Sequence, residues 1–298
     1  LFDLTLDDPE VFRIFNERKF SGLFQFEGAA QRRVSVRIPV KSFQAIDHTT
    51  ALARPGPLGG GAANTYINRA AGREETTYLH PAMERYVGDT HGVVLYQEQV
   101  MKIVRELGNF SWEETSVIRK AMSGRKGTEF FDRRGEMFVE GAGTHGIDPD
   151  TAQEIWRQIV NFGAWGMNRS HTVSYAIISY WCAYMKRYYP LDYAAALLRN
   201  AKDDEQVVET LRELRDEGVP FVPFDPDLSQ ANWSAADGKL VGGYQNLIGI
   251  GPVKAQHYIT KRDSEGLTDE DREKLSRHKP KHNDLAPAHT LWGDIYEH

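Results

Sequence analysis

The stretch NRSHTVSYAIISYWCAYMKRYYP, residues 168–190, predicts one long helix. Ser170 is a residue type that caps helix N-termini, and Pro190 cannot continue a helix, so we expect the helix to run from Ser170 through Tyr188. His171 and Tyr175 are four residues apart and therefore share one face of this helix.

Further helices are predicted on both sides of this stretch. Three signals indicate them: apolar spacing that stops at a glycine, a capping pattern from Ser111 to Glu114, and a proline near a helix start. They predict helices over about 96–107, 111–122, 148–162, 191–201 and 203–217. The first two thirds of the chain are therefore expected to be helical.

The composition of the sequence changes after Gly218. The segments VPFVPFDPD, NWS and ADGKL indicate short strands joined by tight turns, and the chain becomes strongly polar beyond Arg262. We therefore predict a mainly α fold with a large helical domain over 1–217, a small α+β segment over 218–262 and a polar tail over 263–298. One short helix is expected at 268–277, in a tail that is otherwise loosely ordered or part of an incomplete domain.

Composition restricts the class of protein. The net charge of −6 excludes a uniformly basic coat for nucleic acid, although a local basic patch remains open. Cys182 is the single cysteine, which excludes an intramolecular disulfide framework and indicates a reducing, cytoplasmic setting. No apolar run is long enough to span a bilayer. Because the first methionine is Met83, we expect a piece of a longer polypeptide or a processed product.

The stretch RPGPLGGG, residues 54–61, combines two prolines and four glycines behind one arginine. Proline fixes φ and glycine lets a ligand approach the backbone, so a stiff turn followed by bare backbone is expected. An ordinary surface loop and a binding site both fit this composition.

Basic residues are concentrated rather than spread. Arg119, Lys120, Arg125 and Lys126 follow one another at the end of the second helix and in the turn beyond it. They fit either a helix C-terminus favoured by its dipole or a clamp for phosphates. Asn168, Arg169, Ser170 and His171 stand at a helix N-terminus, which favours an anion. His171 and Tyr175 could hold a phosphate and stack on a base, or form a local hydrogen-bonded couple.

Five segments in one order resemble a single family. They are LFQFE at 23–27, ALARPGPL at 51–58, YQEQVM at 96–101, IRKAMSGRK at 118–126 and NRSHTVSYA at 168–176. The chain resembles the α subunit of bacterial DNA polymerase III, the C-family replicative polymerase, from about Asp7 to Arg262. This resemblance implies the fingers portion of a DNA-directed DNA polymerase, a nucleotidyltransferase whose palm carboxylates are absent from this chain.

The resemblance also implies site residues. The family's nucleotide site matches Arg54, Arg119, Lys120, Asn168, Arg169, His171 and Tyr175. Contacts with DNA are implied for Arg125, Lys126 and the GIG glycines Gly249 and Gly251, although a plain turn fits the last two equally. His171 or Lys120 would donate a proton to the departing pyrophosphate. Gln97 and Gln99 could bind nucleic acid or simply pack their helix.

The same resemblance implies cofactors and partners. The cofactor is Mg²⁺, held mainly by the absent palm, and the partners are primer-template DNA, a dNTP, the palm and thumb, and other replisome subunits. Asp3, Asp7 and Asp8 are expected to be linker or helix-cap residues, so this chain alone is expected to be inactive. A metal site at His278 and His282 is not expected, because the intervening Pro280 breaks their helical face. The alternative function is a non-catalytic nucleotide- or DNA-binding accessory module.

Overall fold

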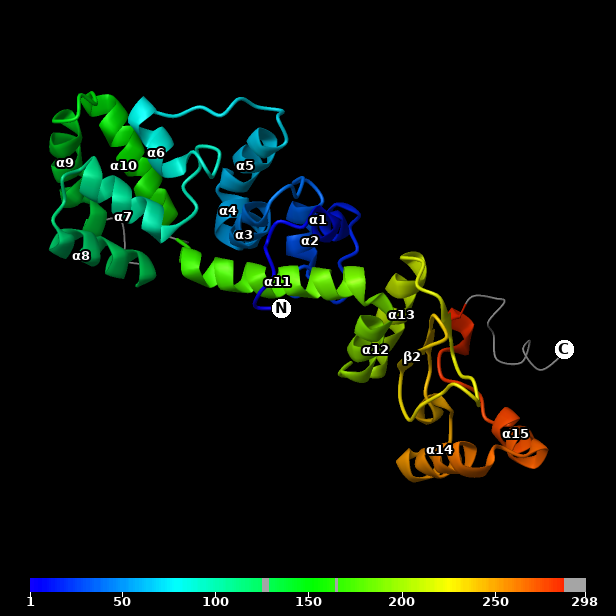
Figure 1. Cartoon of the computed structure of the whole chain (residues 1–298). Helices are drawn as coiled ribbons and strands as arrows, with labels where there is room; N and C mark the ends of the chain where they lie inside the picture. Colours follow the sequence, from blue (N-terminus) through cyan, green and yellow to red (C-terminus); the bar gives the residue numbers. More distant parts are fainter. Residues whose placement is uncertain (125–128, 164–165, 287–298) are drawn as a thin grey trace. The chain divides into compact units, whose positions relative to one another are not determined.

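A computed structural model describes residues 1–124, 129–163 and 166–286 of the chain (Figure 1). These residues form two compact units. Unit 1 comprises Leu1–Arg18 and Phe24–Trp181, and unit 2 comprises Lys19–Leu23 and the chain from Cys182 onward. Helix α11 (Arg169–Tyr188) contributes to both units. The division does not coincide with the change of composition near 218, and the predicted domain bounds stay predictions.

Unit 1 is built from helices. In chain order they are α1 (Pro9–Asn16), α2 (Ala29–Ser35), α3 (Phe43–Leu52), α4 (Pro55–Gly59), α5 (Ala62–Ala70), η1 (Pro81–Met83), α6 (Glu84–Val87), α7 (Gln97–Glu106), α8 (Trp112–Ser123), α9 (Glu129–Gly143), α10 (Pro149–Gly163) and the first part of α11. One core lies among α6 to α10 and a second among α2, α3, α5 and the segment before α7. The prediction of a mainly α fold is confirmed.

Most predicted helices are confirmed, with two corrections. The Ser111 hydroxyl accepts from the Glu114 N–H at 3.1 Å, as its capping pattern predicts. Helix α11, however, begins at Arg169 rather than at Ser170, and Asn168 caps it by accepting from the His171 N–H at 3.3 Å. The 54–61 stretch is also not a plain turn, since Pro55 begins the one-turn helix α4.

Helix α9 was not predicted, because three glycines interrupt its apolar pattern. One of them is needed for packing. A Cβ on Gly141 would overlap the backbone of Gly108, so only glycine lets α9 approach the end of α7 this closely. Trp156 of α10 stacks on Phe138 of α9 with ring centroids 5.4 Å apart, and this pair fills the centre of the first core.

Unit 2 contains the remaining elements. They are α12 (Pro190–Arg199), α13 (Asp204–Asp216), β1 (Phe221–Val222), β2 (Ser234–Ala236), β3 (Lys239–Val241), η2 (Tyr244–Asn246), α14 (Pro252–Glu265), α15 (Asp269–Ser276) and η3 (Asn283–Leu285). The sheet order is β1-β3-β2, with β1 parallel and β2 antiparallel to β3. Asp237 and Gly238 both have positive φ between β2 and β3, as the tight turn predicted at ADGKL requires.

The polar tail is more ordered than the sequence indicates. The helix expected at 268–277 is α15, and Thr268 and Asp271 form a capping box at its start. Leu275 is buried beside Tyr244 and Ile259, and Leu285 belongs to the core around α12 and α13. Residues 263–286 are therefore packed rather than loosely ordered, and residues 287–298 lie outside the described part of the chain.

Across the residues that the structure describes, we find no helix with the length and hydropathy needed to cross a membrane.

Candidate functional site

The start of α11 already holds an acidic group. The Glu98 carboxylate of α7 accepts from the Arg169 N–H, with distances of 3.2 and 3.0 Å from the nitrogen to its two oxygens. Asn168 takes a second helix N–H, that of His171. The N-terminus predicted to favour an anion does so, but in this structure the anion is a carboxylate of the chain itself.

The Arg169 side chain is held by two further carboxylates. Its Nη2 lies 2.9 Å from Asp89 Oδ2, and its Nε lies 3.9 Å from Asp47 Oδ2. The guanidinium also lies over the Tyr96 ring, 5.1 Å from the centroid. The first residue of α11 is therefore fixed to unit 1 through both its backbone and its side chain.

Asp47 is buried beneath this arginine. Its Oδ2 accepts from the Tyr96 hydroxyl at 2.9 Å, whereas its Oδ1 is among the buried polar atoms without a partner in the described part of the chain. Burial raises the pKa of Asp47, and hydrogen bonds from Thr172 and Tyr96 and the charge of Arg169 act against that shift. Arg169 therefore helps to keep a buried carboxylate ionised.

The neighbouring His48 is also buried. Its Nδ1 lies 2.8 Å from the Tyr66 hydroxyl, and its Nε2 has no partner among the described residues. Burial lowers the pKa of His48 from 6.5 to about 4, so the imidazole is neutral at pH 7. This ring is consequently a hydrogen-bonding group rather than a cation.

His171 and Tyr175 pack against each other in unit 1, and Arg54 lies within electrostatic range of Tyr175. The rings of His171 and Tyr175 have centroids 4.2 Å apart, which confirms their shared face, and Tyr175 also contacts Phe24 at 5.2 Å. Burial lowers the pKa of the half-buried Arg54, and the nearby Tyr175 phenol acts in the opposite direction. The charge of Arg54 is thus felt at Tyr175 of α11.

The glycines of the 54–61 stretch face a separate cavity. Gly56, Gly60 and Gly61 line a space of about 740 Å³ together with Arg157 and Asn161 of α10. A Cβ on Gly61 would meet nothing, but its φ of +81° favours glycine at the N-cap of α5. Bare backbone is therefore accessible here, as the composition predicts.

Two of the other predicted basic residues belong to α8. Arg119 and Lys120 are exposed near the end of α8, and no contact between described residues joins either of them to Arg54 or His171. Arg125 and Lys126 lie outside the described residues. The assignment of these four residues to nucleotide or DNA contacts stays a prediction.

Gln97 and Gln99 are structural. The Gln99 Oε1 accepts from the N–H groups of Leu95 and Tyr96 at 2.8 and 3.0 Å, and its Nε2 donates to the Thr90 hydroxyl at 2.8 Å. Gln97 is also buried, and its Nε2 donates to the Gly166 carbonyl at 3.3 Å. Of the two alternatives that the sequence left open, the structure favours packing for both.

The two glycines of the GIG segment are exposed in a turn between η2 and α14 in unit 2, whereas Ile250 between them is buried. Gly249 has a φ of +87°, and Gly251 is the N-cap of α14. His278 fixes the turn, because its Nδ1 lies 2.7 Å from the Ile248 carbonyl oxygen. The side chains of Ile248 and Val253 are largely exposed on either side. The turn thus presents backbone and apolar surface to solvent.

The acidic residues of the described chain do not form a metal centre. Within residues 1–124, 129–163 and 166–286, no group of three or more His, Cys, Asp or Glu side chains could hold a metal ion. Asp8 caps α1 by accepting from the Glu10 N–H at 2.8 Å, which confirms the helix-cap role expected for it. These residues therefore do not fit a two-metal centre of their own.

Sequence reasoning missed the carboxylates that hold α11. Asp47, Asp89 and Glu98 are separated from Arg169 by 71 residues or more, and none belongs to a charge pattern with it. Glu98 lies inside the YQEQVM motif, which was the only signal available. The buried pairing of Asp47 with Tyr96 depends on tertiary packing and leaves no spacing to find.

The sequence of this chain is similar to that of known proteins. Residues 1–146 match the family model described as the bacterial DNA polymerase III alpha subunit finger domain. The chain is 32% identical over 261 residues, 87% of its length, to the DNA polymerase III subunit alpha of Aquifex aeolicus, of which it covers 22%. It is 34% identical over 275 residues, 92% of its length, to the corresponding subunit of Chlamydia pneumoniae, again covering 22%.

A differently named relative shows similar identity. The chain is 33% identical over 258 residues, 86% of its length, to an error-prone DNA polymerase of Corynebacterium efficiens, of which it covers 24%. The chain therefore spans less than a quarter of the length of each of these three relatives. The similarity extends well beyond the part that the family model matches.

Proposed function

We propose that this chain is the finger portion of a DNA-directed DNA polymerase, since residues 1–146 match the family model of the bacterial DNA polymerase III alpha subunit finger domain. In this role it binds the incoming dNTP and the primer-template during template-directed synthesis. The observation that carries the proposal is the packing of the His171 and Tyr175 rings beside the capped start of α11, with the Arg54 charge within electrostatic range of Tyr175.

Each residue of this group has a chemical role in nucleotide binding. The Arg54 guanidinium pairs with phosphate oxygens, for which its planar fork is suited. The adjoining rings of His171 and Tyr175 offer a flat surface to the base or the sugar. Asn168 and Arg169 fix the end of the helix that carries these rings.

The exposed basic residues of α8 complete the proposal. Arg119 and Lys120 neutralise the β- and γ-phosphates, and Arg125 and Lys126 contact triphosphate or template backbone. His171 or Lys120 gives a proton to the departing pyrophosphate. Lysine keeps the charge at position 120 but lacks the two parallel donors of an arginine.

Mg²⁺ belongs to the palm in this proposal. Two-metal phosphoryl transfer needs carboxylates that hold both ions, and the described acidic residues of this chain form no such group. We therefore expect the isolated chain to bind its ligands without extending a primer. In unit 2, backbone N–H groups at Gly249 and Gly251 contact DNA phosphates without reading the sequence.

The test combines binding with complementation. A dNTP and a primer-template are titrated into the purified chain, and primer extension is measured with and without a separately expressed palm from a related polymerase. Binding without extension, with extension restored by the palm, is the expected result. Binding that no palm converts into extension would favour the non-catalytic accessory module. Extension by the chain alone would refute the assignment of the metal ions to the palm.

A further inference from the structure

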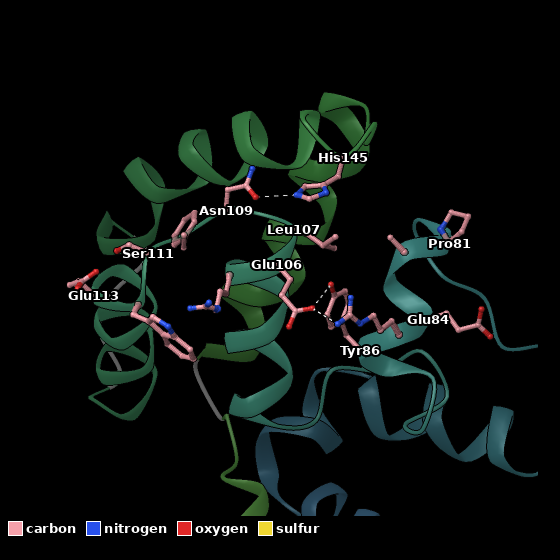
Figure 2. Close-up of a pocket in the computed structure, with 14 residues that line it drawn as sticks. Pro81, Glu84, Tyr86, Glu106, Leu107, Asn109, Ser111, Glu113 and His145 are labelled. Atoms are coloured by element: carbon pink, nitrogen blue, oxygen red, sulfur yellow. Dashed lines mark hydrogen bonds and ion pairs between the residues drawn. The ribbon is translucent and has the colours of Figure 1, made fainter.

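Charges of both signs line a cavity of about 1190 Å³ among η1, α6, the end of α7 and the start of α8 (Figure 2). Its lining includes two arginines and three carboxylates, namely Arg85, Arg105, Glu84, Glu106 and Glu113. One of these arginines is already paired, since Arg85 Nη2 lies 3.1 Å from Glu106 Oε2. The cavity therefore selects no one class of ligand, unlike a surface of a single sign in the same unit.

The stretch from Gly28 to Arg73, which forms α2 to α5, is strongly basic. It holds seven Lys and Arg residues and one carboxylate, Asp47, in a chain whose net charge is −6. Asp47 is only 1% exposed, so it adds no negative charge to the surface. Helices α2 to α5 thus contribute cations to the surface of unit 1 and no carboxylate.

Three exposed cations of this stretch form what we call the basic patch, namely Arg33, Arg37 and Lys41. The residues between them turn inward, since Val34 and Ile38 belong to the core around α2, α3 and α5. Arg33 lies on α2, and Arg37 lies on the turn that continues it, where the Arg37 N–H donates to the Val34 carbonyl at 3.1 Å. The three cations therefore lie on the exposed side of one short segment.

The charge of the basic patch is not neutralised by a direct ion pair. Among residues 1–124, 129–163 and 166–286, no Asp or Glu lies within ion-pair distance of Arg33, Arg37 or Lys41. Asp89 lines a small cavity together with Lys41, but its Oδ2 lies 2.9 Å from Arg169 Nη2. An anion that reaches the patch would therefore meet unpaired positive charge.

Contacts with α1 and α5 hold the patch in place. Asn16 of α1 fixes the residue before Lys41, because its Nδ2 donates to the Val40 carbonyl and its Oδ1 accepts from the Val40 N–H, each at 2.9 Å. Arg37 Nη1 donates to the Asn64 Oδ1 of α5 at 3.1 Å. Binding would need little ordering of this segment, which favours affinity.

The absence of an exposed aromatic ring distinguishes between three anionic partners. The cores of protein interfaces are rich in aromatic residues, and single-stranded nucleic acid is bound by stacking on such rings. Phe43 is the only Phe, Tyr or Trp of residues 28–65, and its ring packs on Tyr180 with centroids 6.4 Å apart. Duplex DNA presents its phosphates outward and keeps its bases stacked, so Arg and Lys suffice to contact it.

We propose that Arg33, Arg37 and Lys41 bind phosphates of the double-stranded part of the primer-template without reading its sequence. The choice of DNA rests on the proposed function, and the three residues lie outside the set assigned to nucleotide binding. The positive end of the α3 dipole, which follows Lys41 in the chain, adds to the same potential.

The salt dependence of DNA binding tests this inference. A fluorescent duplex is titrated into the purified full chain at several salt concentrations, alongside the triple variant Arg33→Ala, Arg37→Ala, Lys41→Ala. The slope of log affinity against log salt should become shallower by about 2–3 in the variant, since each lost phosphate contact removes about 0.9. The affinity near 0.1 M salt should fall about tenfold or more.

Two further variants exclude a general effect of charge or folding. The triple variant Arg13→Ala, Arg85→Ala, Lys274→Ala removes the same charge from residues that are paired with glutamates of the chain, and it should keep the wild-type slope. The variant Arg33→Lys, Arg37→Lys keeps the positive charge and should retain most of the affinity.

Binding of dNTP to the same proteins separates this inference from the proposed function. An unchanged salt slope in the basic-patch variant would overturn the inference and leave the proposed function standing. A wild-type chain that binds dNTP but no duplex would also overturn it, whereas one that binds neither would count against both. Equally tight binding of polyglutamate or of a single-stranded oligonucleotide through the patch would contradict the choice of duplex DNA.

Discussion

Two adjacent residues of α3, Asp47 and His48, illustrate how burial sets the charge near the candidate site. Burial acts on both side chains, but in opposite directions on their pKa values. The effect of burial on the Asp47 pKa is opposed by the charge of the nearby Arg169 and by donated hydrogen bonds. His48, in contrast, stays neutral beside the Tyr66 hydroxyl. The neutral imidazole adds no positive charge next to that arginine.

The low pKa of His48 predicts a loss of stability in acid. An unfolded histidine takes up a proton near pH 6.5, whereas folded His48 does so only near 4. Its contribution to the free energy of unfolding is therefore fully present above pH 6.5. About 3 kcal/mol of it is lost as the pH falls towards 4.

His48→Gln removes this titrating group and should flatten that part of the pH profile. The measurement is urea denaturation of both proteins at several pH values between these limits. The exposed His257→Gln serves as the control and should follow the wild type. Equal acid sensitivity in His48→Gln and the wild type would contradict the buried, neutral state of this ring.

At the scale of elements, two glycines of α9 give a matched pair. Gly141 lies against the backbone of Gly108, whereas a Cβ on Gly143 would meet nothing. Alanine normally stabilises a helix relative to glycine by up to about 1 kcal/mol. Gly143→Ala should therefore be neutral or stabilising.

Gly141→Ala should instead destabilise unit 1 by about 1–3 kcal/mol, because α9 must move away from the end of α7. The free energies of unfolding of the two variants, measured by denaturant titration, provide the comparison. If both substitutions had the same effect, the close approach of α9 to Gly108 would be wrong.

Helices whose ends carry chemical signals were the ones that sequence could predict. Ser111 and Pro149 locate the starts of α8 and α10, and the apolar spacing of α7 agrees with its buried face. Helix α9 was not predicted because its glycines serve tertiary packing. The carboxylates around Arg169 were not predicted for the same reason, since they lie close to it only through the packing of α3, α7 and α11.

At the scale of the whole molecule, each unit combines distant stretches of chain. In unit 2, Lys186 Nζ donates to the Ser21 carbonyl at 2.8 Å and lies 2.7 Å from Glu217 Oε2. Burial lowers the pKa of Lys186 and raises that of Glu217, while each partner's charge acts against these shifts. This pair joins Lys19–Leu23 to the helices that follow Cys182.

Removing one partner of this pair should destabilise unit 2. Lys186→Met leaves Glu217 buried without its cation, which costs about 3 kcal/mol or more. The double variant Lys186→Met, Glu217→Leu should recover much of that loss, since it removes both charges. The free energies of unfolding of the wild type, of Lys186→Met, of Glu217→Leu and of the double variant test this. An effect of the double variant equal to the sum of the two single effects would argue against a coupled pair.

In the proposed function, Arg54 and the aromatic face of α11 bind the incoming nucleotide. The most direct measurement is the dNTP concentration dependence of primer extension by the chain complemented with a palm, comparing Arg54→Ala with the wild type. The matched control is Arg13→Ala, an exposed arginine of α1 paired with Glu10 and Glu17. We expect Arg54→Ala to raise the KM for dNTP about tenfold or more and Arg13→Ala to leave it unchanged. An equal KM in all three proteins would contradict it.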